Sequence, residues 1–256
     1  MKSSSRKSIL ITGATSGFGK AIAQKFAGEG YDVIATGRRA DRLQTLKLEL
    51  ETKNECSVYT LSFDVSSELE CKTVLGDFLA EYGSPDILVN NAGLASGFDK
   101  FQDGLWSDWM AMIDTNVKGL MMVSRLVVPG MIESGQGHII NIGSTASREV
   151  YEKGNVYCAS KHAVEALTKG MRIDLLGTGV KVTQISPGAA DTEFSLVRFH
   201  GDEDKAKSVY KGYQPMTAKD IADVTFYTTT LPAHLCINDV VLTSVAQANS
   251  YYIRRD

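Results

Sequence analysis

Tyr157 and Lys161 stand four residues apart in a stretch rich in small and apolar residues. In a helix, residues at this spacing project from the same face, one turn from each other. A nearby ammonium favours the phenolate, so we expect the pKa of the Tyr157 phenol to fall from about 10 toward the working pH. A phenol tuned in this way can exchange a proton with an alcohol or carbonyl oxygen. Such pairs also occur on solvated helix faces, so the surrounding sequence must decide.

Composition narrows the class of protein. The chain has 256 residues, 43% of them apolar, and a formal net charge of −3, so no broad electrostatic attraction favours nucleic acid or an anionic membrane. No apolar run reaches the roughly 20 residues of a spanning helix. The polar, basic segment Met1–Ser8 precedes an apolar run too short for a signal peptide, which predicts a cytoplasmic protein. The four cysteines are scattered without metal-ligand spacing, and we expect no metal.

Short apolar runs alternate with helical patterns along the whole chain. We expect strands over residues 9–12, 31–36, 57–63, 85–89, 138–143, 180–185 and 240–245. We expect helices over residues 42–50, 67–82, 106–133 and 155–176, with one after the first strand and one beginning at Thr217. Pro129 is expected to kink or break the long helix. This alternation, with no linker, predicts a single α/β domain over residues 1–256 whose parallel sheet carries helices on both faces.

A glycine-rich turn follows the first strand directly. Gly13, Gly17 and Gly19 stand between an apolar run and a helical pattern. Glycines permit a tight turn in which backbone N–H groups approach a pyrophosphate at the positive end of the helix. In this strand–turn–helix context the motif predicts a dinucleotide site.

The end of the second strand indicates which dinucleotide is preferred. NAD sites usually carry an acidic residue there for the ribose 2′-hydroxyl, whereas this chain has Arg38 and Arg39. Two guanidinium groups suit a 2′-phosphate. We therefore expect NADP rather than NAD.

Three further segments should meet the glycine-rich turn. In open α/β sheets, ligands bind beyond the carboxyl ends of the strands. Ser144 follows the fifth predicted strand, and the turn at residues 90–93 follows the fourth. The polar segment at about 190–214 is expected to form a loop over the substrate. These segments and the glycine-rich turn should share one crevice.

With these motifs in order, the chain resembles the short-chain dehydrogenase/reductase family along nearly its whole length. The four motifs are Thr12-Gly13-x-x-x-Gly17-x-Gly19, Asn90-Asn91-Ala92-Gly93, Ser144 with Tyr157-x-x-x-Lys161, and Pro187-Gly188-x-x-x-Thr192. The resemblance implies a Rossmann-like, doubly wound domain with a seven-stranded parallel sheet, a homotetramer, and a catalytic tetrad of Asn116, Ser144, Tyr157 and Lys161. It implies that NADP contacts Gly13, Thr15, Ser16, Gly17, Phe18, Gly19, Arg38, Arg39, Asp64, Val65, Asn91, Ala92, Gly93, Tyr157, Lys161, Pro187, Gly188 and Thr192.

The stretches at residues 33–39, 112–116, 137–146 and 192–199 most resemble one subgroup of the family, the NADP-dependent 3-hydroxy acid dehydrogenases. These enzymes oxidise serine or allo-threonine and reduce malonic semialdehyde. Such a substrate needs a cation for its carboxylate, beside the contact expected from Ser144. The candidates are Arg148, Lys153 and Arg198, of which we favour Arg198 because it lies in the expected substrate loop. The charged insert at residues 147–153 departs from the subgroup pattern and leaves the exact substrate open.

Two alternatives remain. The first is a carbonyl or 3-oxoacyl reductase of the same family with a neutral substrate, for which Phe98, Trp106 and Trp109 would serve if they line the pocket. The second is an NADP-binding regulatory protein without turnover. An intact Ser144, Tyr157 and Lys161 argues against the second.

Overall fold

The computed structural model describes residues 6–256, so the expectation for the basic first residues lies largely outside it. Its centre is a seven-stranded sheet in which every pairing is parallel. The strand order is β3-β2-β1-β4-β5-β6-β9. The strands are β1 (Ser8–Ile11), β2 (Asp32–Gly37), β3 (Val58–Ser62), β4 (Ile87–Asn90), β5 (Gly137–Ile142), β6 (Val180–Pro187) and β9 (Asp239–Leu242). The predicted parallel sheet is confirmed.

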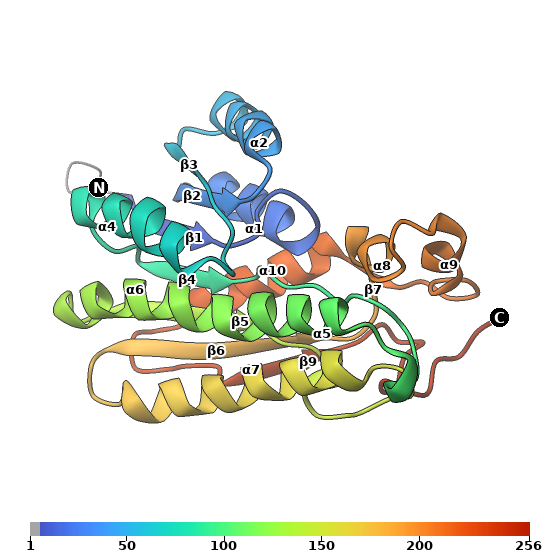
Figure 1. The fold of residues 1–256 in the computed structure, drawn as a ribbon. Helices are drawn as coiled ribbons and strands as arrows, with labels where there is room; N and C mark the ends of the chain where they lie inside the picture. The colour runs from blue at the N-terminus through green and yellow to red at the C-terminus, as the bar shows by residue number, and fades with distance from the viewer. Residues whose placement is uncertain (1–5) are drawn as a thin grey trace.

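Successive side chains of a strand point to opposite faces of the sheet. Both faces carry apolar side chains here, and helices cover both. Ile9 and Ile11 of β1 pack with buried residues of α1 (Gly17–Gly28), α2 (Ala40–Lys53) and α10 (Ala218–Thr229). Leu10, which points to the other face, packs with α4 (Gly76–Tyr82) and α6 (Leu120–Glu133). The helix α7 (Asn155–Asp174) lies beside α5 (Trp106–Ile113) and β6. Figure 1 shows these layers.

Two expected helices contain π-helical turns that the sequence pattern did not predict. The helix expected over residues 67–82 consists of α3 (Glu68–Glu70), the π turn η1 (Cys71–Leu75) and α4. The long helix consists of α5, the π turn η3 (Asp114–Gly119) and α6. Pro129 lies inside α6, which continues to Glu133, so of the expected kink or break the break is wrong.

The expected substrate loop is largely ordered into short elements. They are β7 (Ala190–Asp191), α8 (Glu193–Arg198), α9 (Glu203–Ser208) and β8 (Met216–Thr217), with β7 and β8 paired in parallel. Figure 1 shows α8 and α9 at one end of the molecule, beyond the layered helices. As expected, Thr217 caps α10, since its hydroxyl accepts a hydrogen bond from the Asp220 N–H.

Short 3₁₀ turns, η2 (Phe101–Asp103) and η4 (Thr145–Ser147), complete the fold. Within residues 6–256 no helix is both long and apolar enough to cross a bilayer.

Candidate active site

One large cavity, of about 750 Å³, opens at the carboxyl ends of the central strands. It is lined together by the glycine-rich turn, by Asn91–Gly93 and by Ser144, as the sequence predicted. Every residue expected to contact NADP lines this cavity except Gly19. Segments that are far apart in sequence therefore form one continuous surface.

Gly19 instead serves close packing. A Cβ at Gly19 would lie 2.3 Å from the Gly13 carbonyl oxygen, so no side chain fits there. Gly13 and Gly17 have φ values of 68° and 51°, which favour glycine. The Asn91 amide donates hydrogen bonds to the carbonyls of Thr12 and Gly13, at 2.8 and 3.2 Å. The turn is thus held in a shape that leaves the start of α1 open to a phosphate.

Two arginines stand beside the glycine-rich turn, directly after β2. Arg38 lies 3.4 Å from the Asp64 carboxylate. The Arg39 guanidinium donates to Thr15 Oγ1 at 2.7 Å and to Ser16 Oγ at 3.0 Å. Both guanidinium groups line the cavity, and no acidic residue occupies the end of β2. Their arrangement fits a 2′-phosphate better than a free ribose hydroxyl.

Tyr157 and Lys161 occupy one face of α7, both buried. The Lys161 Nζ donates to the Ile142 carbonyl at 2.9 Å and lies 6.0 Å from the centre of the Tyr157 ring. Ser144 caps the η4 turn and lines the cavity near both residues. The expected shared helix face is present.

The expected lowering of the Tyr157 pKa by Lys161 is absent. Burial raises the pKa of the Tyr157 phenol well above its ordinary value, and a hydrogen bond with Ser144 and the charge of Arg198 only partly oppose it. Burial also lowers the pKa of Lys161, to about 8. A low phenol pKa follows from the neighbouring positive charge alone. It is not found because both groups are also buried, and burial disfavours the charged form of each.

Asn116 lies in the π turn η3, fully hydrogen-bonded. Its amide nitrogen donates to the Leu94 carbonyl at 2.8 Å and to Ser160 Oγ at 3.0 Å, and its Oδ1 accepts from the Leu94 N–H. A Cβ at Gly93 would lie 3.2 Å from Asn116 Oδ1 and 3.6 Å from Lys161 Nζ. The Asn116 and Lys161 side chains therefore converge at the turn after β4.

Arg198 reaches the same centre from α8. Its guanidinium carbon lies 4.9 Å from the centre of the Tyr157 ring and 5.3 Å from that of Phe194. Its Nη2 donates to the Tyr151 hydroxyl at 2.8 Å. Its buried Nε has no hydrogen-bond partner among residues 6–256. A cation with unused donor capacity thus stands beside the tyrosine.

The other two proposed cations lie in different surroundings. Arg148 forms ion pairs with Glu165 and Asp239 and is not among the residues that line the cavity, so the structure does not bring it to the site and this expectation is corrected. The Lys153 Nζ lies 5.7 Å from the Phe98 ring centre.

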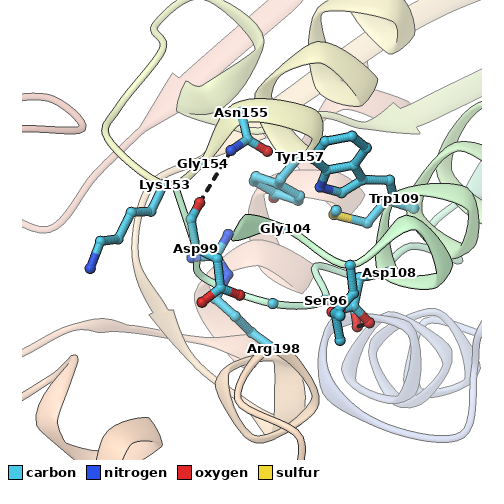
Figure 2. A pocket seen from close by; sticks show the side chains of 13 residues that line it. Ser96, Asp99, Gly104, Asp108, Trp109, Lys153, Gly154, Asn155, Tyr157 and Arg198 are labelled. Carbon is cyan, nitrogen blue, oxygen red and sulfur yellow. Dashed lines mark hydrogen bonds between the residues drawn. The ribbon is translucent and has the colours of Figure 1, made fainter. Parts of the chain in front are cut away.

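A small pocket beside the main cavity also borders Tyr157. Figure 2 shows Tyr157, Trp109 and Arg198 among its lining residues. Of the three aromatic residues considered for a neutral substrate, Phe98 lines the main cavity, Trp109 the small pocket, and Trp106 is exposed.

Sequence reasoning missed several residues of the site. Tyr151 stands among the charges of the insert at residues 147–153, and its aromatic ring there gives no sequence signal of a site. Phe194 and Glu193 belong to the substrate loop, but only the folded path of α8 shows that they line the cavity. Arg255 in the C-terminal tail also lines it, and donates to the Val209 carbonyl at 3.1 Å. No local sequence signal indicates this return of the tail.

Comparison with known proteins agrees with this geometry. A sequence model described as short chain dehydrogenase matches residues 7–201. The chain belongs to the short-chain dehydrogenase family. It is 46% identical to the NADP-dependent 3-hydroxy acid dehydrogenase of Escherichia coli strain K12, over 94% of this chain and 96% of the relative. It is 44% identical to sulfoacetaldehyde reductase 2 of Chromohalobacter salexigens, over 97% and 98% of the two chains.

Solved structures of family members have the same fold. The closed form of a serine dehydrogenase in complex with NADP+ aligns with a TM-score of 0.88 at 44% identity. The alignment covers 97% of this chain and all of that one. The single Rossmann-like domain with a parallel seven-stranded sheet is therefore shared with a dehydrogenase of known structure.

Proposed function

We propose that the protein is an NADP-dependent oxidoreductase that transfers a hydride between nicotinamide and a small 3-hydroxy acid, such as serine or allo-threonine, or the matching semialdehyde. The position of Arg198 is the main support for an acidic substrate. Its guanidinium lies 4.9 Å from the Tyr157 ring centre, and its Nε has no hydrogen-bond partner among the described residues. The relatives named for 3-hydroxy acid and serine oxidation support it.

The cavity offers a place for each part of NADP. The glycine-rich turn and the start of α1 would hold the pyrophosphate, and Arg38 and Arg39 would hold the 2′-phosphate. Asp64 and Val65 would border the adenine, while Asn91–Gly93, Pro187, Gly188 and Thr192 would border the ribose and nicotinamide. When bound, the nicotinamide supplies or accepts the hydride.

The residues around Tyr157 would supply the proton chemistry. In reduction, Tyr157 donates its phenolic proton to the carbonyl oxygen, while Ser144 donates a hydrogen bond to the same oxygen. The raised pKa of Tyr157 keeps the phenol protonated, as a proton donor must be. Lys161 would hold the nicotinamide ribose, and Asn116, which meets Lys161 at Gly93, would support the path by which the proton is replaced.

Arg198 would bind the substrate carboxylate. Its guanidinium has a planar set of donors suited to two carboxylate oxygens, and the Tyr151 hydroxyl fixes its orientation. Because α8 carries it, the segment at about 190–214 would act as the substrate loop. The aldehyde named for one relative carries a sulfonate, an anion that the same guanidinium could hold.

A neutral substrate is the second candidate, as for a carbonyl or 3-oxoacyl reductase. Phe98 at the main cavity and Trp109 at the small pocket favour it.

The test follows nicotinamide absorbance with NADP or NAD and a panel of alcohols. The panel contains serine, allo-threonine, 3-hydroxypropionate, 3-hydroxyisobutyrate, 2-hydroxyethanesulfonate and a neutral secondary alcohol. We expect turnover with NADP and the carboxylic acids. Turnover with the neutral alcohol alone would establish the second candidate, and turnover with the sulfonate alone would exclude a hydroxy acid. Tight NADP binding without turnover of any compound would instead favour a regulatory protein.

We also propose that the protein is a homotetramer. Exposed apolar side chains gather on the helices that flank the site, among them Trp106 of α5, Met121 of α6 and Ile173 of α7. Burying them between subunits would remove apolar surface from water. Light scattering should report four chains per particle, and a monomer at micromolar concentration would contradict this proposal.

A further inference from the structure

An ionic contact joins the substrate loop to α2, beside the arginines expected to hold the 2′-phosphate. Glu193, the first residue of α8, accepts hydrogen bonds from Arg42 Nη1 through both carboxylate oxygens, at 3.0 and 3.1 Å. A second guanidinium, that of Arg39, lies 3.4 Å from the same carboxylate. Arg42 belongs to α2, so the contact links elements 151 residues apart in the chain.

This contact stands above the glycine-rich turn. Thr192, which precedes Glu193, packs over Gly17: a Cβ built on Gly17 would lie 3.6 Å from the Thr192 Cβ. Glu193, Gly17 and Arg39 all line the main cavity. The Glu193 and Arg42 side chains are 47% and 45% exposed, which places the ion pair at the rim rather than in the interior. The pair therefore crosses the opening above the expected phosphate site.

Arg42 and Arg39 differ in what else they bind. Arg39 donates its shorter hydrogen bonds to Thr15 and Ser16, inside the cavity. Within residues 6–256, the Arg42 guanidinium forms hydrogen bonds and an ion pair with Glu193 alone. A 2′-phosphate can therefore occupy Arg39 while Arg42 keeps Glu193 in place.

We propose that Arg42 and Glu193 form a clasp across the mouth of the nucleotide cleft, and that this clasp slows the release of NADP. The inference rests on the proposed function only in taking NADP as the cofactor. It assigns Glu193 and Arg42 a positioning role: they hold α8 across the cleft and perform no chemistry. Because α8 also carries Arg198, opening the clasp would loosen the substrate end as well.

The expected effect is modest. An ion pair this exposed changes an equilibrium by about twofold to fivefold, and salt at about 1 M should remove most of that difference, since screening then acts within about 3 Å. Loops that must open for product release often limit turnover, so a faster release can also raise the turnover number.

The experiment measures NADPH release by stopped-flow fluorescence. The variants are Glu193→Gln, Arg42→Gln, the two combined, and the charge exchange Arg42→Glu with Glu193→Arg. We expect each single variant to release NADPH about two to five times faster, the combination to be no faster than either, and the charge exchange to restore slow release. Glu203→Gln, which removes a more exposed pair with Lys207 on α9, should change nothing.

Three results would overturn the clasp. Slower release from Glu193→Gln would mean that the carboxylate repels the cofactor phosphate. Multiplying effects in the combined variant would mean that the two residues act independently. Unchanged release from every variant, with normal NADPH affinity, would remove the clasp and leave the proposed function standing. If the wild-type protein failed to bind NADPH, both proposals would be wrong.

Discussion

At Tyr157, burial and charge act on the phenol in opposite directions. The surrounding protein raises its pKa, and the cation identified as lowering it is Arg198 rather than Lys161. The neutral phenol is therefore the stable form in the structure. A buried proton donor of this kind is suited to reduction of a carbonyl group.

Removing only the Tyr157 hydroxyl separates catalysis from binding. Tyr157→Phe keeps the ring that packs against Phe194 but loses the proton donor. Turnover should fall by about 10²- to 10⁴-fold, while the NADP dissociation constant stays within about twofold because most contacts along the cavity remain. Steady-state rates and cofactor fluorescence titration check the two parts. Turnover near that of the wild type would contradict the assigned proton donor.

Arg198 can be tested with a matched arginine in the same chain. Arg198→Met should raise KM for a hydroxy acid about 10- to 100-fold, as expected for losing a hydrogen bond to a charged group, with little change for a neutral substrate. Arg148→Met is the control, because Arg148 is already paired with Glu165 and Asp239. Equal effects of both substitutions would show that general charge, rather than a carboxylate contact, is responsible.

At the scale of elements, most strands and helices were predictable within two or three residues. The strands β1, β4 and β5 are apolar runs that end in glycine or asparagine turns, and both signals are local. The π turns η1 and η3 were not predictable. Each turn inserts one extra residue into a helix, and in so short a segment this leaves the spacing of the apolar residues looking helical. Their position depends on packing against the sheet.

Some residues of the candidate site were predictable from the sequence, and others were not. Strand ends and helical spacing predicted where Ser144, Tyr157, Lys161 and the glycine-rich turn lie, and the family resemblance added the catalytic roles. Tyr151, Glu193 and Arg255 reach the cavity only through the path of the folded chain. The direction of the Tyr157 pKa shift was mistaken for the same reason, since burial is a property of the assembled fold.

Two glycines in helices allow a matched test of the nucleotide turn. Gly19→Ala places a Cβ 2.3 Å from the Gly13 carbonyl oxygen, so we expect NADP affinity to fall at least about tenfold. Gly76→Ala, at the start of α4, meets no atom within 4 Å and should be neutral or stabilise the protein by up to about 1 kcal/mol. Fluorescence titration and urea unfolding measure these effects. Unchanged NADP affinity in Gly19→Ala would contradict the role of the turn.

At the scale of the whole molecule, stability should depend on a buried histidine. His138 in β5 lies 2.7 Å from Thr183 Oγ1, and burial together with the charge of Lys181 lowers its pKa to about 4. The unfolded chain, with an ordinary histidine pKa of about 6.5, binds more protons between these values. Stability is therefore lost as the pH falls through this window.

The change is measurable by urea unfolding at two pH values. Between pH 7 and pH 5 the His138 contribution should cost roughly 2 kcal/mol of unfolding free energy. In His138→Gln this part of the pH dependence should disappear, although the variant can be less stable at both values. An identical pH dependence in the variant would show that other groups are responsible.

The central claim is that this family member acts on a small acid through Arg198. It is tested most directly by comparing kcat/KM for a 3-hydroxy acid with that for its primary amide, using NADP and the wild-type enzyme. The two compounds have nearly the same shape and differ in charge. We predict a preference for the acid of about 10- to 100-fold. Equal values, or a preference for the amide, would contradict the claim and support a neutral carbonyl substrate.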